Sequence, residues 1–344
     1  MLQKYICASG LKRAIAFRKS VEFPIYRGIS EPSVLCALPS YAVPTKDENT
    51  AKAVSSPSRR SFNVKISAIA SPGAGSFSLS HNSTIAGGRL DVVHWREGRM
   101  LRIWTPSGFV QSESPRSAYP VMYLNDGQNL FGDRPTLSGQ SWHAAEAAAG
   151  LINSGALPPF VIVGIDHSGS IRSYDYLPYP PGNANGYRLD AESWPGGGVD
   201  AYLRAVVDEI LPYTERTYGV SSAPALRGFG GSSFGGICAL CAALRHPGVF
   251  GSLLVESPSL WFAEERLLKH DLPDFTGPWP TRVFLAMGTK EYSGILSSHE
   301  SGFDTKLVAY THELAALLGR KGLVGGLMDA EHMYIHRYHF QFST

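Results

Sequence analysis

The sequence lacks any run of apolar residues close to the roughly 20 that an α-helix needs to cross a bilayer. Cysteine is scarce as well, because four cysteines in 344 residues are too few for a disulfide framework. Cys238 and Cys241 have C-x-x-C spacing, but they fall in an apolar stretch and no second Cys/His pair stands at zinc spacing. We therefore expect no membrane span and no metal site, and we expect both thiols to pack in the core.

The body of the chain also lacks an excess of positive charge. Residues 1–60 carry ten Lys/Arg and four Asp/Glu, whereas the remainder carries 21 basic and 25 acidic residues. A mildly acidic body argues against a nucleic-acid partner. The basic, serine-rich start has no apolar signal-peptide core and is typical of a transit peptide, so we expect a chloroplast or mitochondrial location. The alternative is a disordered basic extension on a cytoplasmic protein.

From residue 75 to residue 344 the pattern is that of one domain, in which apolar strands alternate with helices. The first two expected strands form a hairpin around the turn at 97–98. Strands are expected at 89–95, 99–104, 121–124, 160–165, 225–229, 253–255 and 283–287, and helices at 141–149, 199–213, 234–244 and 311–318. Such alternation predicts an α/β fold with a mostly parallel central sheet and helices on both faces.

The most specific motif is G-x-S-x-G at residues 231–235, with Ser233 at its centre. An expected strand precedes it, and an expected small-residue helix follows it at 234–244. That setting is required for a nucleophile elbow, in which a strained turn exposes the serine hydroxyl at the top of an α/β-hydrolase sheet. The alternative is a glycine-rich connecting loop. We expect Ser233 to be a nucleophile.

A serine nucleophile needs a base, and in α/β-hydrolases the triad follows the chain order Ser, acid, His. His332 comes after a short strand pattern and a loop near the C-terminus, which makes it the expected base. The alternatives in the sequence are His299, His312, His336 and His339.

The acid should lie between Ser233 and His332, at the end of a strand. Glu291 follows the expected strand at 283–287 and is our choice. Glu256 ends the preceding expected strand and is the main rival, while Asp304 and Asp329 are weaker candidates.

An oxyanion hole needs two backbone N–H groups. One is expected from Phe234, directly after the nucleophile. The other is expected from Gln128, in the loop at 125–129 after an early strand, where Gly127 allows an unusual turn.

The connection at 166–198 is unusually long, and aromatic residues recur along it. Long loops inside a compact domain are usually functional, and loops at this edge of an α/β sheet surround the ligand. The residues expected to contact an aryl or hydrophobic substrate are Arg172, Tyr174, Tyr176, Trp194 and Trp261. The alternative is that the rings pack the loop onto the body of the domain.

Five segments together resemble one family. The matching segments are residues 121–131, 213–218, 231–236, 257–261 and 288–291. The chain from about 90 to 340 is similar to the α/β-hydrolase family of esterase D, enterochelin-esterase-like proteins, feruloyl esterases and mycolyltransferases. It departs from that family at Glu256, where a small or apolar residue is usual, and in lacking a Trp near His332.

The resemblance implies a serine hydrolase that acts on small-molecule carboxylic esters without a cofactor or a metal. It implies Ser233 as nucleophile, His332 as base and Glu291 as acid, with Gln128 and Phe234 forming the oxyanion hole. Two alternatives share the same fold: transfer of the acyl group to an alcohol, and a binding module without catalysis.

Overall fold

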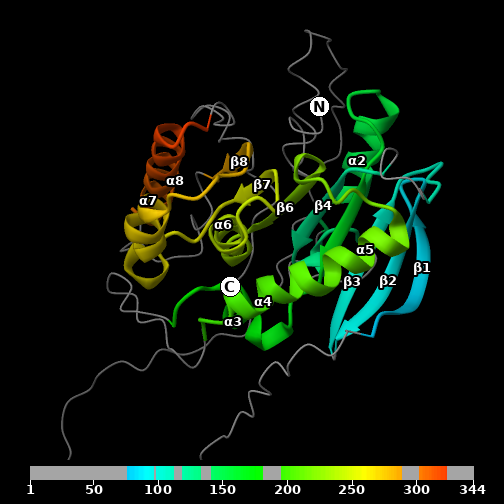
Figure 1. The fold of residues 1–344 in the computed structure, drawn as a ribbon, viewed down its shortest axis with the longest axis horizontal. Coiled ribbons are helices and arrows are strands. Elements are labelled where there is room, and N and C mark those ends of the chain that lie inside the picture. Colours follow the sequence, from blue (N-terminus) through cyan, green and yellow to red (C-terminus); the bar gives the residue numbers. More distant parts are fainter. Residues whose placement is uncertain are drawn as a thin grey trace, which may run out of the picture. The chain divides into compact units, whose positions relative to one another are not determined.

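An eight-stranded sheet organises the described part of the chain (Figure 1). The computed structural model describes residues 76–96, 98–111, 118–132, 141–180, 195–288 and 302–323. The strands are β1(Ser78–Ile85), β2(Gly88–Arg96), β3(Arg99–Thr105), β4(Val121–Asn125), β5(Val161–Ile165), β6(Arg227–Ser232), β7(Ser252–Glu256) and β8(Arg282–Ala286). Their order across the sheet is β1-β2-β3-β5-β4-β6-β7-β8.

The sheet is mostly parallel, as the sequence predicts. Strands β5, β4, β6, β7 and β8 pair in parallel, while β1, β2 and β3 form antiparallel pairs that join the sheet at β5. Strand β1 was not predicted, because nearly all of its side chains are exposed and polar and it carries no apolar alternation. Backbone hydrogen bonds to β2 hold β1 in the sheet, and its side chains contribute little to that.

All four predicted helices are present, with shifted ends. The helices are α2(Ala144–Asn153), α3(Arg172–Tyr176), α4(Val199–Ala205), α5(Leu211–Tyr218), α6(Phe234–Arg245), α7(Leu272–Asp274) and α8(Phe303–Arg320). A π-helical stretch at Val206–Ile210 joins α4 to α5. The helix expected at 311–318 begins eight residues earlier, and the long connection at 166–198 contains α3.

Two apolar layers enclose the sheet, because side chains alternate between its faces. Met122 and Leu254 face the layer that contains α2. Tyr123, Phe229 and Val255 face the layer built with α4, α5 and α6 (Figure 1). Helices therefore cover both faces, and the strand order and directions are those of the α/β-hydrolase fold that the sequence predicts.

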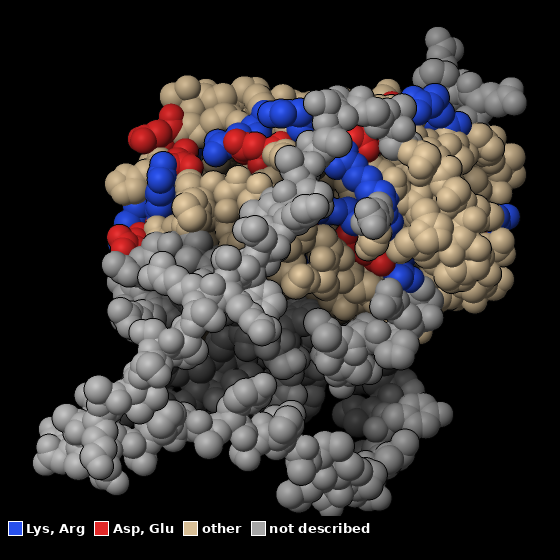
Figure 2. Space-filling model, turned by 90° about the horizontal axis from the view of Figure 1, so that it is seen from below, with Lys and Arg blue, Asp and Glu red and all other residues tan. Residues whose placement is uncertain are grey.

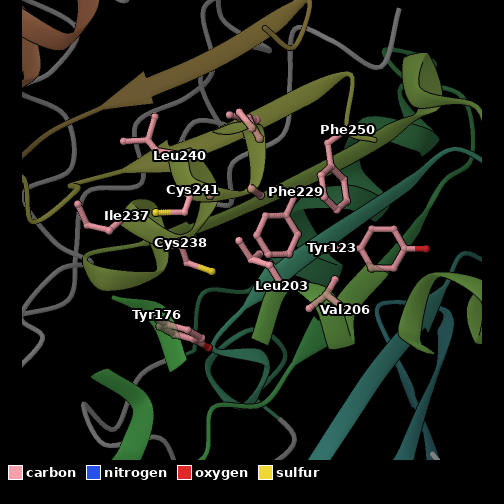
Figure 3. Packing of buried hydrophobic residues seen from close by; sticks show 14 of the residues in the cluster. Tyr123, Tyr176, Leu203, Val206, Phe229, Ile237, Cys238, Leu240, Cys241 and Phe250 are labelled. Carbon is pink, nitrogen blue, oxygen red and sulfur yellow. The ribbon is translucent and has the colours of Figure 1, made fainter. Parts of the chain in front are cut away.

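The larger apolar layer packs aromatic rings against the small residues of α6. Phe229 of β6 lies 5.0 Å from the Phe250 ring, between centroids, and both face Tyr123 (Figure 3). Cys238 and Cys241 are fully buried in this layer as free thiols. Burial raises the pKa of Cys241 to about 12 and that of Cys238 well above its usual value. Both thiols stay neutral, which confirms the prediction that they pack in the core.

Charged side chains of both signs lie close together on the surface. On the face seen from below, blue and red side chains adjoin one another among the described atoms (Figure 2). Among the described helices, none has both the length and the apolar character that crossing a bilayer requires. The expected transit peptide, residues 1–60, lies outside the described residues.

A close backbone contact joins β5 to the loop after β4. A Cβ atom on Gly164 would lie 2.9 Å from the Cα of Gly127 and 2.9 Å from a methyl carbon of Leu130. A Cβ on Gly127 would in turn lie 2.6 Å from the carbonyl carbon of Gly164. Only glycine fits at these two positions without moving the loop.

We therefore expect Gly164→Ala to lower the free energy of unfolding by about 1–3 kcal/mol, the usual cost of overpacking. Gly150→Ala is the matched control. Gly150 lies in α2, and a Cβ there meets nothing within 4 Å, so the substitution should stabilise the helix by roughly 0.5–1 kcal/mol. Urea unfolding of both variants measures the difference, and equal stability of Gly164→Ala and wild type would contradict the packing argument.

Candidate active site

Ser233 occupies a sharp turn between β6 and α6. Its backbone has φ 58° and ψ −121°, a conformation that residues with a side chain rarely adopt. Such strain costs on the order of 1–3 kcal/mol and persists only where the surroundings enforce it. The strand, the turn and the helix are those that the G-x-S-x-G motif predicts.

Small residues around the turn let three backbone segments meet. A Cβ on Gly231 would lie 2.9 Å from the carbonyl carbon of Gly235 and 3.0 Å from Cβ of Asn125. A Cβ on Gly235 would lie 3.3 Å from the side chains of Asn125 and Asp126. The glycines thus bring the end of β4 against the start of α6.

The segment after β7 holds Ser233 from the other side. The Ser233 N–H donates to the carbonyl of Glu256 at 3.0 Å. The Ser233 Oγ lies 3.1 Å from the Oγ of Ser259, which is buried. Sequence reasoning missed Ser259, although it lies in the Ser-Pro-Ser segment that follows β7.

The expected oxyanion loop lies at the end of β4, the strand that pairs with β6. Asp126 takes a left-handed conformation, with φ 59° and ψ 44°, and a 3₁₀ turn follows at Gly127–Asn129. The Oε1 of Gln128 accepts a hydrogen bond from the N–H of His167 at 3.1 Å. Gln128 and Phe234 thus come from the ends of two neighbouring strands, β4 and β6.

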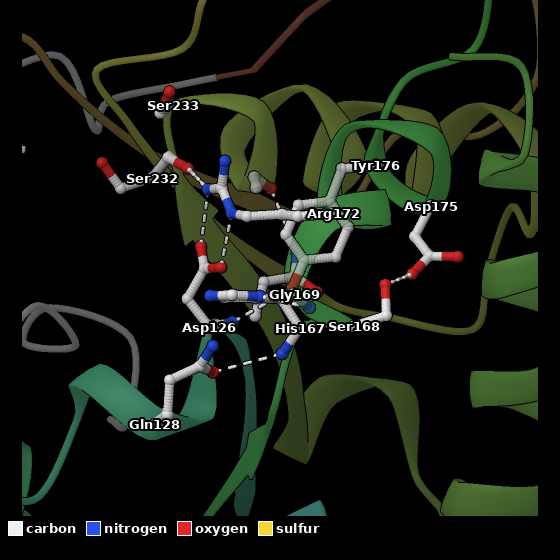
Figure 4. Close-up of polar contacts among 12 residues, drawn as sticks. Asp126, Gln128, His167, Ser168, Gly169, Arg172, Asp175, Tyr176, Ser232 and Ser233 are labelled. Carbon is white, nitrogen blue, oxygen red and sulfur yellow. Dashed lines mark hydrogen bonds and ion pairs between the residues drawn. The ribbon is translucent and has the colours of Figure 1, made fainter. Parts of the chain in front are cut away.

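An ion pair links the loop after β4 to the turn at Ser233. Arg172 of α3 binds both carboxylate oxygens of Asp126, at 2.7 and 2.8 Å, and reaches the carbonyl of Ser232 at 3.4 Å (Figure 4). The hydroxyl of Tyr176 accepts a hydrogen bond from the Asp126 N–H at 3.1 Å. Burial alone would lower the pKa of Arg172, but the Asp126 charge raises it above its usual value. Arg172 stays charged and forms an ion pair with Asp126, a partner that the sequence patterns do not reveal.

The aromatic candidates fall into two groups. Tyr176 is fully buried and meets Tyr202 edge-on, with 5.3 Å between the ring centroids, so it packs the connection onto the body. The Tyr174 ring lies against Gly198, where a Cβ would come within 2.4 Å of it. Trp261 is half-buried beside Phe234, with 6.3 Å between the ring centroids. Of the aromatic candidates that the structure describes, Trp261 is the one whose ring packs against Phe234 of the elbow.

The remaining expected site residues divide between the described and the undescribed parts of the chain. Glu291, His332 and Trp194 lie outside the described residues. Glu256, the rival acid, is buried at the end of β7 and is in register with Ser232. The alternative base His312 is exposed on α8. Among the described residues, no group of three or more His, Cys, Asp and Glu side chains could hold a metal.

The described residues bring two of the expected parts of the site to the same end of the parallel strands. A strained, partly exposed serine stands at the N-terminus of α6, where the helix dipole favours negative charge. The loop that carries Gln128 lies at the end of the adjacent strand β4. Such a site can bind a carbonyl group and stabilise an anion that forms on its oxygen.

Known proteins share this sequence pattern. A family model described as "Putative esterase" matches residues 97–293, more than half of the chain. The chain is 26% identical to the uncharacterized protein YbbA of Bacillus subtilis over 200 residues, which cover 58% of this chain and 71% of YbbA. It is 28% identical to the iron(III) enterobactin esterase of Dickeya dadantii over 221 residues, which cover 59% of this chain and 44% of that enzyme.

Some solved structures of hydrolases also resemble the chain. An IroE-like serine hydrolase from Shewanella oneidensis matches with a TM-score of 0.47 and 22% identity, over 64% of this chain and 65% of that one.

The matched region spans less than half of the length of the Dickeya dadantii enterobactin esterase. The family itself is shown by the model that covers residues 97–293. The chain belongs to this esterase family.

Proposed function

We propose that this protein is a serine esterase that hydrolyses carboxylic esters through an acyl-enzyme on Ser233. The observation that carries the proposal is the strained backbone of Ser233 between β6 and α6. Strain of this kind persists at sites where it serves the chemistry, and here it lifts the hydroxyl out of the sheet. Membership of the esterase family supports the same reaction.

In the proposed mechanism, His332 takes the proton of the Ser233 hydroxyl as the oxygen attacks the ester carbonyl. The negative charge that forms on the carbonyl oxygen is stabilised by the backbone N–H groups of Phe234 and Gln128. The alcohol leaves with the proton from His332, and water then attacks the acyl-enzyme by the same route. Glu291 holds the histidine in the correct tautomer, and Glu256 is the alternative acid.

The names of the relatives suggest a first substrate to test. The iron(III) enterobactin esterase and the ferri-bacillibactin esterase BesA both carry siderophores in their names. We propose a siderophore ester as the substrate class, with Trp261 beside the nucleophile to contact it. Hydrolysis of p-nitrophenyl acetate, followed by a panel of siderophore and aryl esters, tests the reaction and then the substrate.

Ser233→Ala should abolish ester hydrolysis and leave the fold intact, because it removes the nucleophile from a partly exposed position without opening a cavity. Loss of a triad residue lowers turnover by about 10⁴ or more. Turnover of p-nitrophenyl acetate and circular dichroism measure the two effects. Ser221→Ala is the control, since it removes a buried hydroxyl next to Val220, which pairs with Tyr119 ahead of the amino end of β4 and lies outside the proposed site. A Ser233→Ala protein that keeps a tenth of the wild-type turnover would refute the proposal.

His332→Ala should be comparably inactive, because no other group would then accept the nucleophile's proton. His336→Ala and His339→Ala should change turnover by less than about threefold, since chain order assigns them no role. The three variants are compared with the same ester. An active His332→Ala beside an inactive His336→Ala would move the base to His336.

Glu291→Gln should lower turnover more than Glu256→Gln. An amide neither fixes the histidine tautomer nor stabilises the imidazolium, and the equivalent change in a serine protease lowers turnover by about 10⁴. Both variants are assayed with one activated ester and checked for folding by circular dichroism. If Glu256→Gln is folded and inactive while Glu291→Gln is active, then Glu256 is the triad acid.

A further inference from the structure

The side-chain hydroxyl of Ser259 contacts the hydroxyl of Ser233, the proposed nucleophile. Its Oγ lies 3.1 Å from the Oγ of Ser233, and either atom can donate the hydrogen bond. Ser259 is 3% exposed, so water does not compete freely for its hydroxyl. We propose that Ser259 is a positioning residue that orients the Ser233 hydroxyl and donates a hydrogen bond to its oxygen during the reaction. This inference rests on the proposed esterase function.

The backbone around Ser259 is tied to the nucleophile turn. The Ser259 N–H donates to the Ser233 carbonyl at 3.4 Å, and the Ser259 carbonyl accepts from the Phe262 N–H at 3.0 Å. The Phe262 ring packs edge-on against Phe234, with 5.8 Å between the centroids. Ser259 is therefore held against the residues on which it acts, and its hydroxyl needs only a rotation to change hydrogen-bond direction.

The same segment is anchored to the neighbouring strand. Ser257, at the start of the segment, has a left-handed backbone with φ 40°. Its N–H donates to the carbonyl of Ala286, the last residue of β8, at 2.8 Å. The chain after β7 therefore turns sharply across the end of β8, and this turn directs Ser259 back toward Ser233.

The path of the protons in the reaction sets the direction of the hydrogen bond between Ser259 and Ser233. Ser233 gives its proton to the base as its oxygen forms a bond to the acyl carbon, and from then on it has no proton to donate. The bond from the acyl carbon to the alcohol oxygen breaks, and the alcohol takes the proton from the base. Ser259 keeps its own proton throughout and can donate it to the Ser233 oxygen.

The same donor acts in both halves of the reaction. During acylation it stabilises negative charge on the attacking Ser233 oxygen. During deacylation that oxygen is the leaving group, and it again gains negative charge as its bond to the acyl carbon breaks. Ser259 should therefore affect kcat rather than the binding of substrate.

We expect Ser259→Ala to lower kcat for p-nitrophenyl acetate by about 10- to 100-fold, the usual worth of a hydrogen bond to a charged group. KM should change by less than about twofold, and the rate of Ser233 phosphonylation by a fluorophosphonate should fall in parallel with kcat. Ser221→Ala is the matched control: Ser221 is 4% exposed, and its hydroxyl accepts a hydrogen bond from the Ala223 N–H at 3.1 Å. It should lose a similar amount of thermal stability and keep the wild-type kcat.

A second variant keeps the test decisive if Ser259→Ala does not fold. Ser259→Cys keeps the shape of the side chain with a somewhat larger sulfur atom and offers a weaker donor, so its kcat should also fall at unchanged KM. A folded Ser259→Ala, or a folded Ser259→Cys in its place, with wild-type kcat and phosphonylation rate would overturn the positioning role alone. A wild-type protein that is not phosphonylated at Ser233 would overturn both this inference and the proposed function.

Discussion

The site depends on one steric constraint, the strained backbone of Ser233. A residue with a side chain at φ 58° and ψ −121° stays there only when its neighbours leave no alternative. Gly231 and Gly235 remove the side chains that would push β4 and α6 apart. The hydrogen bond from the Ser233 N–H to Glu256 then secures the turn from β7. Because the turn is fixed in this way, the Ser233 hydroxyl projects from a defined position at the end of β6.

Parallel strands gather the remaining parts of the site around that point. Because β4, β6 and β7 are neighbours and run in the same direction, the loops that follow them meet at one edge of the sheet. The loop after β4 carries Gln128, and it can pack against β5 because both Gly127 and Gly164 lack side chains. Arg172 adds a charge-paired link between that loop, through Asp126, and the carbonyl of Ser232 (Figure 4). The loop after β7 contributes Ser259, so the ends of three neighbouring strands meet beside Ser233.

Much of this arrangement could be predicted from local patterns. The apolar strands and the G-x-S-x-G motif each carry their signal within a few residues, so the mostly parallel sheet and the turn at Ser233 were foreseen. Contacts between distant segments have no such signal, and for that reason neither the Asp126–Arg172 ion pair nor the Ser233–Ser259 contact was predicted. Tyr176 shows the same limit, since an aromatic residue in a long connection can face a ligand or the core, and here it is buried. Strand β1 was missed because it is polar and exposed, so backbone pairing with β2 holds it in the sheet and no apolar pattern marks it in the sequence.

We propose that Ser233 is a nucleophile whose strained turn and neighbouring loops are arranged to receive a carbonyl oxygen. A crystal structure of the protein after reaction with a fluorophosphonate tests this most directly, because the phosphonyl oxygen stands in for the oxyanion. We expect phosphorus bonded to the Oγ of Ser233, with its oxygen about 3 Å from the backbone nitrogens of Phe234 and Gln128. Phosphorus on another residue, or a phosphonyl oxygen that points away from both nitrogens, would refute the assignment of Ser233 as the nucleophile.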